Sequence, residues 1–302
     1  MPSLEGKLER DGESHMSVGP FHLTFYGLAF VAGLLAAFLW VAKAAARRGI
    51  SSDFVYDLAL WATGGGVIGA RAVHVVLEWP TYAANPERIL QLQQGGLAWH
   101  GGLIGGAIGV WVATRRHGVS FLHAADLVAP ALALGQAIGR VGCDIFGKSS
   151  TLPWAVLVNG QRVHPQQVYE LLVDWVIFVF LSRRSAGRPA PAGTLLFLYL
   201  LLASFGRFWV EFFRNSTMVG FFSDGQWASL VGMLLGAVGL AGLAIVERRR
   251  KPALGAGVAG RESNAQKTPS RGMAWYLRAA VDVGTPLLLT AIYYWRVGAG
   301  LH

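Results

Sequence analysis

Apolar runs close to 20 residues long recur along the whole chain, and this feature limits its possible folds more than any other. A helix of about 20 residues is long enough to cross about 30 Å of hydrocarbon. Hydrophobic residues make up 53% of the chain and charged residues only 14%, whereas an average soluble domain is about 25% charged. The sequence therefore predicts an all-α, polytopic membrane helix bundle. It excludes an ordinary soluble enzyme and a disordered protein.

Seven apolar windows predict transmembrane helices, and a weaker eighth lies near the C-terminus. The seven windows are Phe21–Ala44, Phe54–Leu77, Leu97–Ala113, Phe121–Gly142, Val168–Leu181, Gly193–Phe213 and Trp227–Val246. The eighth, Ala279–Trp295, is interrupted by Asp282 and Pro286. We expect it to span the membrane. The alternative is a helix that lies in the interface, held there by Trp275 and Tyr276.

The windows divide the chain into four segments. Residues 1–20 are predicted to form an external N-terminal tail, and their polar, mixed charge is not that of a signal peptide. Residues 21–247 form the seven-span body. Residues 248–273 are predicted to be a basic cytoplasmic linker, and residues 274–302 a C-terminal hydrophobic extension.

Basic residues follow every odd-numbered window, and this pattern predicts the orientation. They are Lys43, Arg47 and Arg48 after the first window, Arg115 and Arg116 after the third, Arg183, Arg184 and Arg188 after the fifth, and Arg248, Arg249, Arg250 and Lys251 after the seventh. Loops rich in lysine and arginine stay in the cytoplasm, so the N-terminus is predicted outside. The 26 basic and 17 acidic residues, a net charge of +9, are explained by this topology. No nucleic-acid partner is expected.

With this topology, the polar residues in and beside the windows gather at one depth, near the outer leaflet. They are Tyr26, Arg71, His100, Arg140, Cys143, His164, Gln167, Tyr169, Glu170, Arg207, Glu211, Arg214 and Gln226. Polar groups inside a span are costly and usually face a cavity or the bundle interior. Arg140 lies on the fourth window and Arg207 on the sixth. Two helices that each present an arginine predict a phosphate clamp, because guanidinium binds phosphate oxygens bidentately.

Several of these residues also have a simpler explanation. Arg71 is typical of a side chain that snorkels to the interface. Arg207 and Glu211 are four residues apart and are expected to pair along one helix face. His100 at a helix start is often structural, and Tyr26 fits an aromatic belt. Only the clustering of all these residues at one depth favours a site.

Glycines spaced by four residues predict close helix packing. They are Gly65 and Gly69, Gly101, Gly105 and Gly109, Gly102 and Gly106, and Gly135 and Gly139. Faces of small residues allow helix backbones to approach each other in lipid. We expect these helices to contact one another through their glycines.

Several strings of the sequence resemble the bacterial prolipoprotein diacylglyceryl transferases. Residues 99–105, WHGGLIG, are similar to the family motif HGGLIG, and residues 139–142, GRVG, to the start of GRxGN. Residues 164–170, HPQQVYE, resemble HPxQLYE, and residues 207–214, RFWVEFFR, resemble RFxxEFxR. Shorter matches at Tyr26-Gly27-Leu28, Gly69-Ala70-Arg71 and Gly225-Gln226-Trp227 occur in the family order. The resemblance covers about residues 21–246.

The resemblance implies a reaction and its residues. Such enzymes, in the bacterial cytoplasmic (inner) membrane, transfer a diacylglyceryl group from phosphatidylglycerol to the lipobox cysteine thiol of a preprolipoprotein. A thioether forms and glycerol 1-phosphate leaves. By resemblance, His100 is the candidate base for the thiol, and Arg140 and Arg207 hold the phosphate. The implied substrate-binding residues are Tyr26, Arg71, Gly147, Gln167, Tyr169 and Glu211. No metal or organic cofactor is implied.

Departures from the family pattern support a second interpretation. Cys143 stands where the family has asparagine, and Ala203 where it has tyrosine. A catalytically idle relative that binds anionic lipid or prolipoprotein is the alternative that these changes favour. A transporter of an anionic lipid is a third, but the charged residues concentrate at one leaflet and not at the midplane. Cys143 is not expected to be a nucleophile, because the transfer uses the substrate's own thiol.

Overall fold

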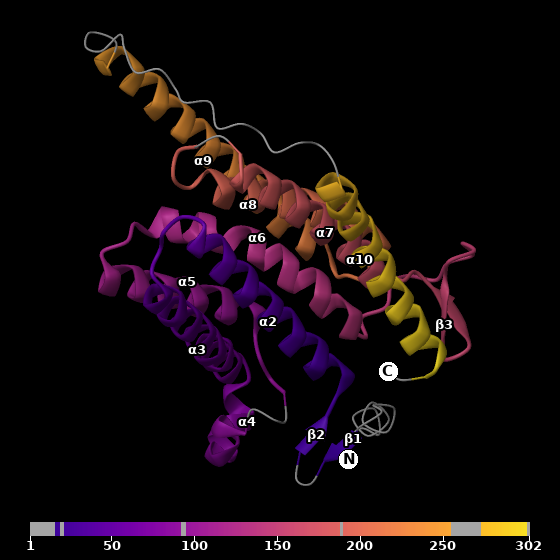
Figure 1. Cartoon of the computed structure of the whole chain (residues 1–302). Helices are drawn as coiled ribbons and strands as arrows, with labels where there is room; N and C mark the ends of the chain where they lie inside the picture. Colours follow the sequence, from indigo (N-terminus) through magenta and orange to yellow (C-terminus); the bar gives the residue numbers. More distant parts are fainter. Residues whose placement is uncertain (1–15, 19–20, 92–94, 188–189, 255–272, 301–302) are drawn as a thin grey trace. The chain divides into compact units, whose positions relative to one another are not determined.

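The computed structural model describes residues 16–18, 21–91, 95–187, 190–254 and 273–300 of the chain. Within these residues, each of the eight predicted windows falls on one long helix (Figure 1). These helices are α2 (Phe25–Ala46), α3 (Ser52–Leu77), α5 (Trp99–His117), α6 (Phe121–Gly139), α7 (Gln166–Ser185), α8 (Thr194–Val210), α9 (Asp224–Leu254) and α10 (Met273–Gly298). The predicted all-α membrane protein is therefore confirmed.

Short elements join the long helices. They are α4 (Trp79–Ala84), the 3₁₀ turns η1 (Pro86–Leu90), η3 (Arg140–Gly142) and η4 (Glu211–Phe213), and the hairpins β1–β2 (Met16–Val18, Phe21–Leu23), β3–β4 (Val156–Val158, Gln161–Val163) and β5–β6 (Met218–Val219, Phe222–Ser223). Each hairpin is antiparallel and pairs only neighbouring strands. The 3₁₀ turns η3 and η4 continue α6 and α8 directly, and each carries charged residues at the helix end.

Five of the described helical segments are long and apolar enough to cross a membrane. They are Phe25–Ala46, Ser52–Leu77, Phe121–Gly142, Thr194–Phe213 and Asp224–Arg249. In four of them at most 22% of the apolar window is buried, as expected of lipid-facing helices, whereas 56% of the window in Phe121–Gly142 is buried inside the protein. The helix α7 is not among the five, and it carries Glu170 and Asp174 within its apolar length. A count of seven or eight spans stays a prediction.

The segment boundaries differ from the expected ones at two places. Met16–Val18, predicted as part of the N-terminal tail, pairs with Phe21–Leu23 in the hairpin β1–β2. The helix α9 continues to Leu254, so the basic residues from position 248 onward lie in its last turns and not in a linker. The rest of the predicted linker, residues 255–272, lies outside the described residues.

The chain forms two compact units, which are described separately. One unit contains residues 1–37 and 129–302, and the other contains residues 38–128. In the second unit, α3 and α5 pack through their glycines, as predicted. A Cβ atom on Gly105 would lie only 2.1 Å from the Gly65 carbonyl oxygen, and one on Gly101 only 2.2 Å from the Gly69 oxygen. The two helix backbones are therefore in direct contact.

Gly105→Ala is expected to destabilise the protein. The new methyl group would overlap the Gly65 carbonyl, and overpacking of this kind costs about 1–3 kcal/mol. Thermal unfolding in detergent measures the change. The matched control is Gly64→Ala on α3, where a Cβ atom meets nothing within 4 Å. Equal melting temperatures for the two variants would contradict the glycine contact.

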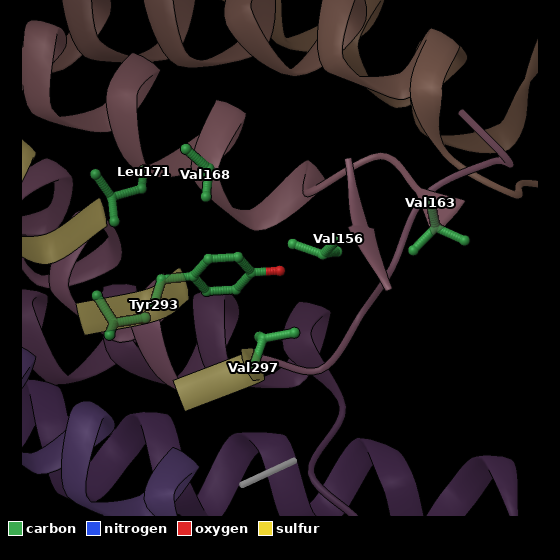
Figure 2. Close-up of a cluster of buried hydrophobic side chains, with 7 residues drawn as sticks. Val156, Val163, Val168, Leu171, Tyr293 and Val297 are labelled. Atoms are coloured by element: carbon green, nitrogen blue, oxygen red, sulfur yellow. The ribbon is translucent and has the colours of Figure 1, made fainter. Parts of the chain in front are cut away.

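In the first unit, an apolar cluster joins four parts of the chain, which are η3, the hairpin β3–β4, α7 and α10. Figure 2 shows Tyr293 of α10 among the valines of the hairpin β3–β4 and the first turns of α7. The cluster consists of Val141, Val156, Val163, Val168, Leu171, Tyr293 and Val297. The cluster includes apolar residues of η3 and α7. The polar residues of these two elements belong to the site described next.

Candidate active site

A buried glutamate binds two arginines from two other helices. Glu170 lies in the second turn of α7, Arg140 begins η3 at the end of α6, and Arg207 lies in the last turn of α8. Arg140 Nη1 is 2.7 Å from Glu170 Oε2, and Arg207 Nη1 is 2.5 Å from Glu170 Oε1. Each carboxylate oxygen therefore holds a different guanidinium group. This arrangement fixes the two arginines at one place, as the predicted phosphate clamp requires.

The helix α7 supplies this carboxylate from a buried polar stripe. Gln166, Glu170 and Asp174 are spaced by four residues, and all three are buried. Gln166 Nε2 donates a hydrogen bond of 3.2 Å to Glu170 Oε1. Asp174, one turn further, interacts electrostatically with both Arg140 and Arg207. Residues four apart share one helix face, so α7 presents all three groups in one direction.

A second carboxylate orients Arg207 from the other side. Arg207 Nε lies 3.2 Å from Glu211 Oε2, so the expected pair along the helix does form. Glu211 is buried, and its other oxygen accepts hydrogen bonds from Ser216 and, at 3.4 Å, from Ser223 Oγ. A Cβ atom on Gly225 would lie 2.6 Å from the Glu211 carboxylate, so the backbone closes over it. Arg207 is therefore held between two fixed carboxylates.

Both arginines keep part of their side chain open. The exposed fraction of the side chain is 24% for Arg140 and 33% for Arg207, against 7% for Glu170. Pre-oriented cations are strong ligands for an anion, because little reorganisation is needed when it arrives. This geometry suits a ligand on which negative charge is present or develops.

Tyr26 and Gln167 lie beside the turn that carries Arg140. Tyr26, half-exposed at the start of α2, interacts electrostatically with Cys143 and Arg140. A Cβ atom on Gly142 would lie 2.8 Å from the Tyr26 Cα atom, so this turn packs tightly on α2. Gln167 is buried, and its Nε2 donates to the Cys143 carbonyl at 3.3 Å. The structure thus brings these two predicted residues next to Arg140.

Tyr169 and Gly147 lie in a network that anchors the loop after η3. The Tyr169 hydroxyl lies 3.0 Å from His164 Nδ1 and accepts a hydrogen bond of 2.9 Å from Trp154 Nε1. The Gly147 amide donates to the His164 carbonyl at 3.1 Å, and a Cβ atom there would lie 2.4 Å from the Phe213 carbonyl oxygen. A glycine is therefore required for packing at this position. These contacts are made with the protein itself.

Arg71 belongs to the second unit, where it organises the segment before α5. The residue is buried and its five N–H groups all donate to backbone carbonyls. The acceptors are the carbonyls of Arg88 at 2.5 Å, Ile89 at 2.9 Å, Gln91 at 3.3 Å, Gly95 at 2.6 Å and Gly96 at 2.9 Å. The guanidinium group also lies 5.2 Å from the centre of the Tyr82 ring. A snorkelling arginine would not be buried in this way.

His100 also belongs to the second unit. It lies in the first turn of α5 and is exposed. The segment before it is tied to α3, because the Ala98 amide donates to the Ala70 carbonyl at 3.0 Å. The start of α5 is thus fixed by the same end of α3 that carries Arg71.

Sequence reasoning placed Glu170 among the polar residues but assigned it no role in the site. The available signal was a pair of acidic residues, Glu170 and Asp174, four apart inside an apolar helix. A carboxylate in such a position needs a cationic partner. Arg140 and Arg207 are two of the four arginines at the same predicted depth, with Arg71 and Arg214, so the sequence offers them as candidate partners without singling them out.

The fold and this cluster define a helical membrane protein in which two arginines from different helices meet at one buried glutamate. The model of the prolipoprotein diacylglyceryl transferase family matches residues 13–242, which is more than half of the chain. The chain belongs to this family. The resemblance predicted from its motifs is therefore confirmed.

Several relatives are similar over most of the chain. The phosphatidylglycerol–prolipoprotein diacylglyceryl transferase of Nostoc sp. is 37% identical over 257 residues, which cover 78% of this chain and 90% of the relative. The protein of that name from Gloeobacter violaceus is 35% identical over 258 residues, with 78% and 94% covered. That from Clostridioides difficile is 37% identical over 221 residues, with 72% and 89% covered. Because the matches include most of each relative, they compare nearly whole proteins.

Proposed function

We propose that this protein transfers the diacylglyceryl group of phosphatidylglycerol to the lipobox cysteine thiol of preprolipoproteins. The observation that carries the proposal is the bracket of Arg140 and Arg207 around Glu170. The leaving group of this reaction carries a phosphate, and two fixed guanidinium groups match its charge. The names of the relatives support the same two substrates.

In the proposed reaction, the cysteine sulfur attacks the glyceryl carbon that bears the phosphate. A carbon–sulfur bond forms, the carbon–oxygen bond to phosphate breaks, and its electron pair leaves with glycerol 1-phosphate. The thiol must lose its proton, because the thiolate is the reactive form, and in this proposal His100 is the base that accepts it, as the family resemblance implies. Arg140 and Arg207 then stabilise the charge that develops on the phosphate oxygens. Glu170 and Glu211 keep both guanidinium groups in place.

The remaining predicted residues act in this proposal by shaping the site. Tyr26 orients the headgroup or the thiol, and Gln167 holds the turn that follows Arg140. Arg71, Tyr169 and Gly147 support the loops around the substrates. No metal or organic cofactor enters the proposed chemistry.

We place the site at the outer leaflet of the bacterial inner membrane. The proposed body has seven spans, with the N-terminus outside and α10 as an eighth span. The basic residues at the C-terminal ends of α2, α5, α7 and α9 support this orientation. Arg140, Glu170 and Arg207 lie at the opposite ends of α6, α7 and α8 from those expected in the cytoplasm. Both substrates are available at that leaflet.

The decisive experiment uses the purified full chain. It is incubated with phosphatidylglycerol and a lipobox peptide, and mass spectrometry detects the diacylglyceryl thioether and glycerol 1-phosphate. A peptide with serine in place of the lipobox cysteine is the control. No thioether from folded protein that still binds phosphatidylglycerol would favour the idle relative. Movement of intact lipid between leaflets, without any adduct, would favour the transporter.

Cys143→Ser is expected to keep transfer within about twofold of the unmodified rate. Burial raises the pKa of the Cys143 thiol, and the nearby Glu170 and Asp144 add to this effect while Arg140 opposes it. A raised pKa keeps the thiol protonated near neutral pH, so it is a poor nucleophile. The rate of thioether formation measures the effect. Complete loss of transfer would instead indicate a covalent role for Cys143.

A further inference from the structure

The helix α10 lies beyond residue 242, where the match to the family model ends. It nevertheless packs against α7, beside which it lies in Figure 1. At one end, Trp175 Nε1 donates to the Asp282 carbonyl at 2.7 Å, and Arg183 Nη2 lies 2.5 Å from the Asp282 carboxylate. At the other end, the Tyr293 hydroxyl donates to Gln167 Oε1 at 3.1 Å. The two helices are therefore antiparallel neighbours joined at both ends.

The inner face of α10 is buried like a protein core. Tyr293 is 0% exposed and Val297 is 5% exposed. Figure 2 shows the Tyr293 ring between Val168 and Leu171 of α7 and the valines of the hairpin β3–β4. The Tyr294 hydroxyl donates to the Trp154 carbonyl at 2.7 Å. Removing this helix would uncover the back of the site.

The last turns of α10 deliver a buried arginine to the turn beside Arg140. Arg296 is 0% exposed. Its Nη2 atom donates to the Cys143 carbonyl at 2.8 Å and lies 2.7 Å from Asp144 Oδ1. Its guanidinium group also lies 5.4 Å from the centre of the Phe25 ring. Arg296 thereby joins α10 to the end of η3 and to the start of α2.

The Cys143 carbonyl is the point where these contacts converge. It accepts one hydrogen bond from Gln167 on α7 and one from Arg296 on α10. The Cys143 amide in turn donates to the Arg140 carbonyl at 3.3 Å. The backbone of the turn that carries Arg140 is therefore held by one side chain from each of these helices.

We propose that α10 is a positioning element of the transferase and that Arg296 is its positioning residue. Arg296 fixes the turn 140–144, and through it the direction in which Arg140 meets Glu170 and the substrate phosphate. Breaking a buried ion pair is strongly destabilising, because one charge is left buried without its partner. The turn 140–144 therefore depends on the pair of Arg296 and Asp144. The expected change in kcat rests on the proposed transfer reaction. The fixing of the turn 140–144 by Arg296 does not depend on that reaction.

Kinetics of Arg296→Gln test the catalytic part. A small displacement of a catalytic group costs up to about 100-fold in rate, so kcat is expected to fall about 10- to 100-fold, with KM for both substrates within about twofold. Arg296→Lys, which keeps the charge but has fewer donors, is expected to recover part of kcat. Tyr293→Phe removes one hydrogen bond and is expected to cost about threefold. The matched control is Arg183→Gln, which breaks the exposed ion pair at the other end of α10 and is expected to leave kcat unchanged.

The only cysteine of the chain, Cys143, reports docking independently of activity. Its partly buried thiol is expected to react slowly with a maleimide in the unmodified protein. Arg296→Gln is expected to increase this rate several-fold, and Arg183→Gln is not.

Two outcomes would overturn the proposal. The first is that folded Arg296→Gln has the same kcat and the same labelling rate of Cys143 as the unmodified protein. The second is a loss of kcat that equals the loss of folded protein, or that Arg183→Gln shares. If the unmodified protein forms no thioether at all, the transfer reaction is wrong, and the labelling rates still decide whether Arg296 holds the turn.

Discussion

Arg207→Ala and Arg140→Ala are each expected to lower diacylglyceryl transfer about 100- to 1,000-fold, which is the usual cost of removing one donor from a charge-stabilising site. Each arginine meets one oxygen of Glu170, so either change removes half of the bracket. Initial rates of thioether formation at saturating phosphatidylglycerol measure the effect. Because the developing phosphate charge is the target, the loss is expected mainly in kcat.

Two further variants separate this role from a general loss of positive charge. Arg207→Lys keeps the charge but cannot form the planar, two-pronged contact, so it is expected to recover only part of the rate. Arg115→Ala removes an exposed arginine from the last turn of α5 and is expected to have no effect. Unmodified rates in both alanine variants at positions 140 and 207 would remove the proposed site.

His100→Ala is expected to lower kcat/KM about 100- to 10,000-fold near neutral pH, the range for loss of a general base. The defect should shrink as the pH rises, because a free cysteine thiol ionises by itself with a pKa of about 8.5. Rates of peptide modification between about pH 6.5 and 9.5 measure this dependence. Above the pKa of the thiol, a base is no longer needed to remove its proton. The pH–rate profiles of the variant and the unmodified protein are therefore expected to converge at high pH.

His123→Ala serves as the matched control for His100→Ala. His123 is an exposed histidine in the first turn of α6 and belongs to the same unit of the chain. It is expected to leave both the rate and the pH profile unchanged. A His100→Ala defect of the same size at every pH would indicate a structural role and contradict the assignment as base.

The sequence was sufficient to predict the helices and the arginines of the site. Apolar length located α2, α3 and α5 to α10, because a membrane span must satisfy its backbone internally. The four-residue spacing of glycines predicted the contact between α3 and α5, since only glycine permits backbones within this distance. Arg140 and Arg207 were predicted from their depth and from their motifs. These features depend on local patterns, which a sequence records directly.

The partners of these residues were harder to predict, because they depend on helix rotation and docking. Nothing in the spacing of Arg140 and Arg207 shows that Glu170 accepts from both. Arg296 was overlooked because the eighth window was treated as an extension of uncertain placement. The burial of its charge follows from the docking of α10 on the turn after η3 and on the start of α2. A charged residue in a weakly apolar segment was the signal that pointed to it.

Arg71 has a consequence for how this chain can vary. A guanidinium group has five N–H donors, and all five are used on the carbonyls of residues 88, 89, 91, 95 and 96. Lysine has three donors and glutamine two, so every exchange at position 71 leaves at least two of these carbonyls without their donor. Changes in the segment that carries these carbonyls must therefore be accompanied by a change at position 71. A segment of a different length would need a different side chain there.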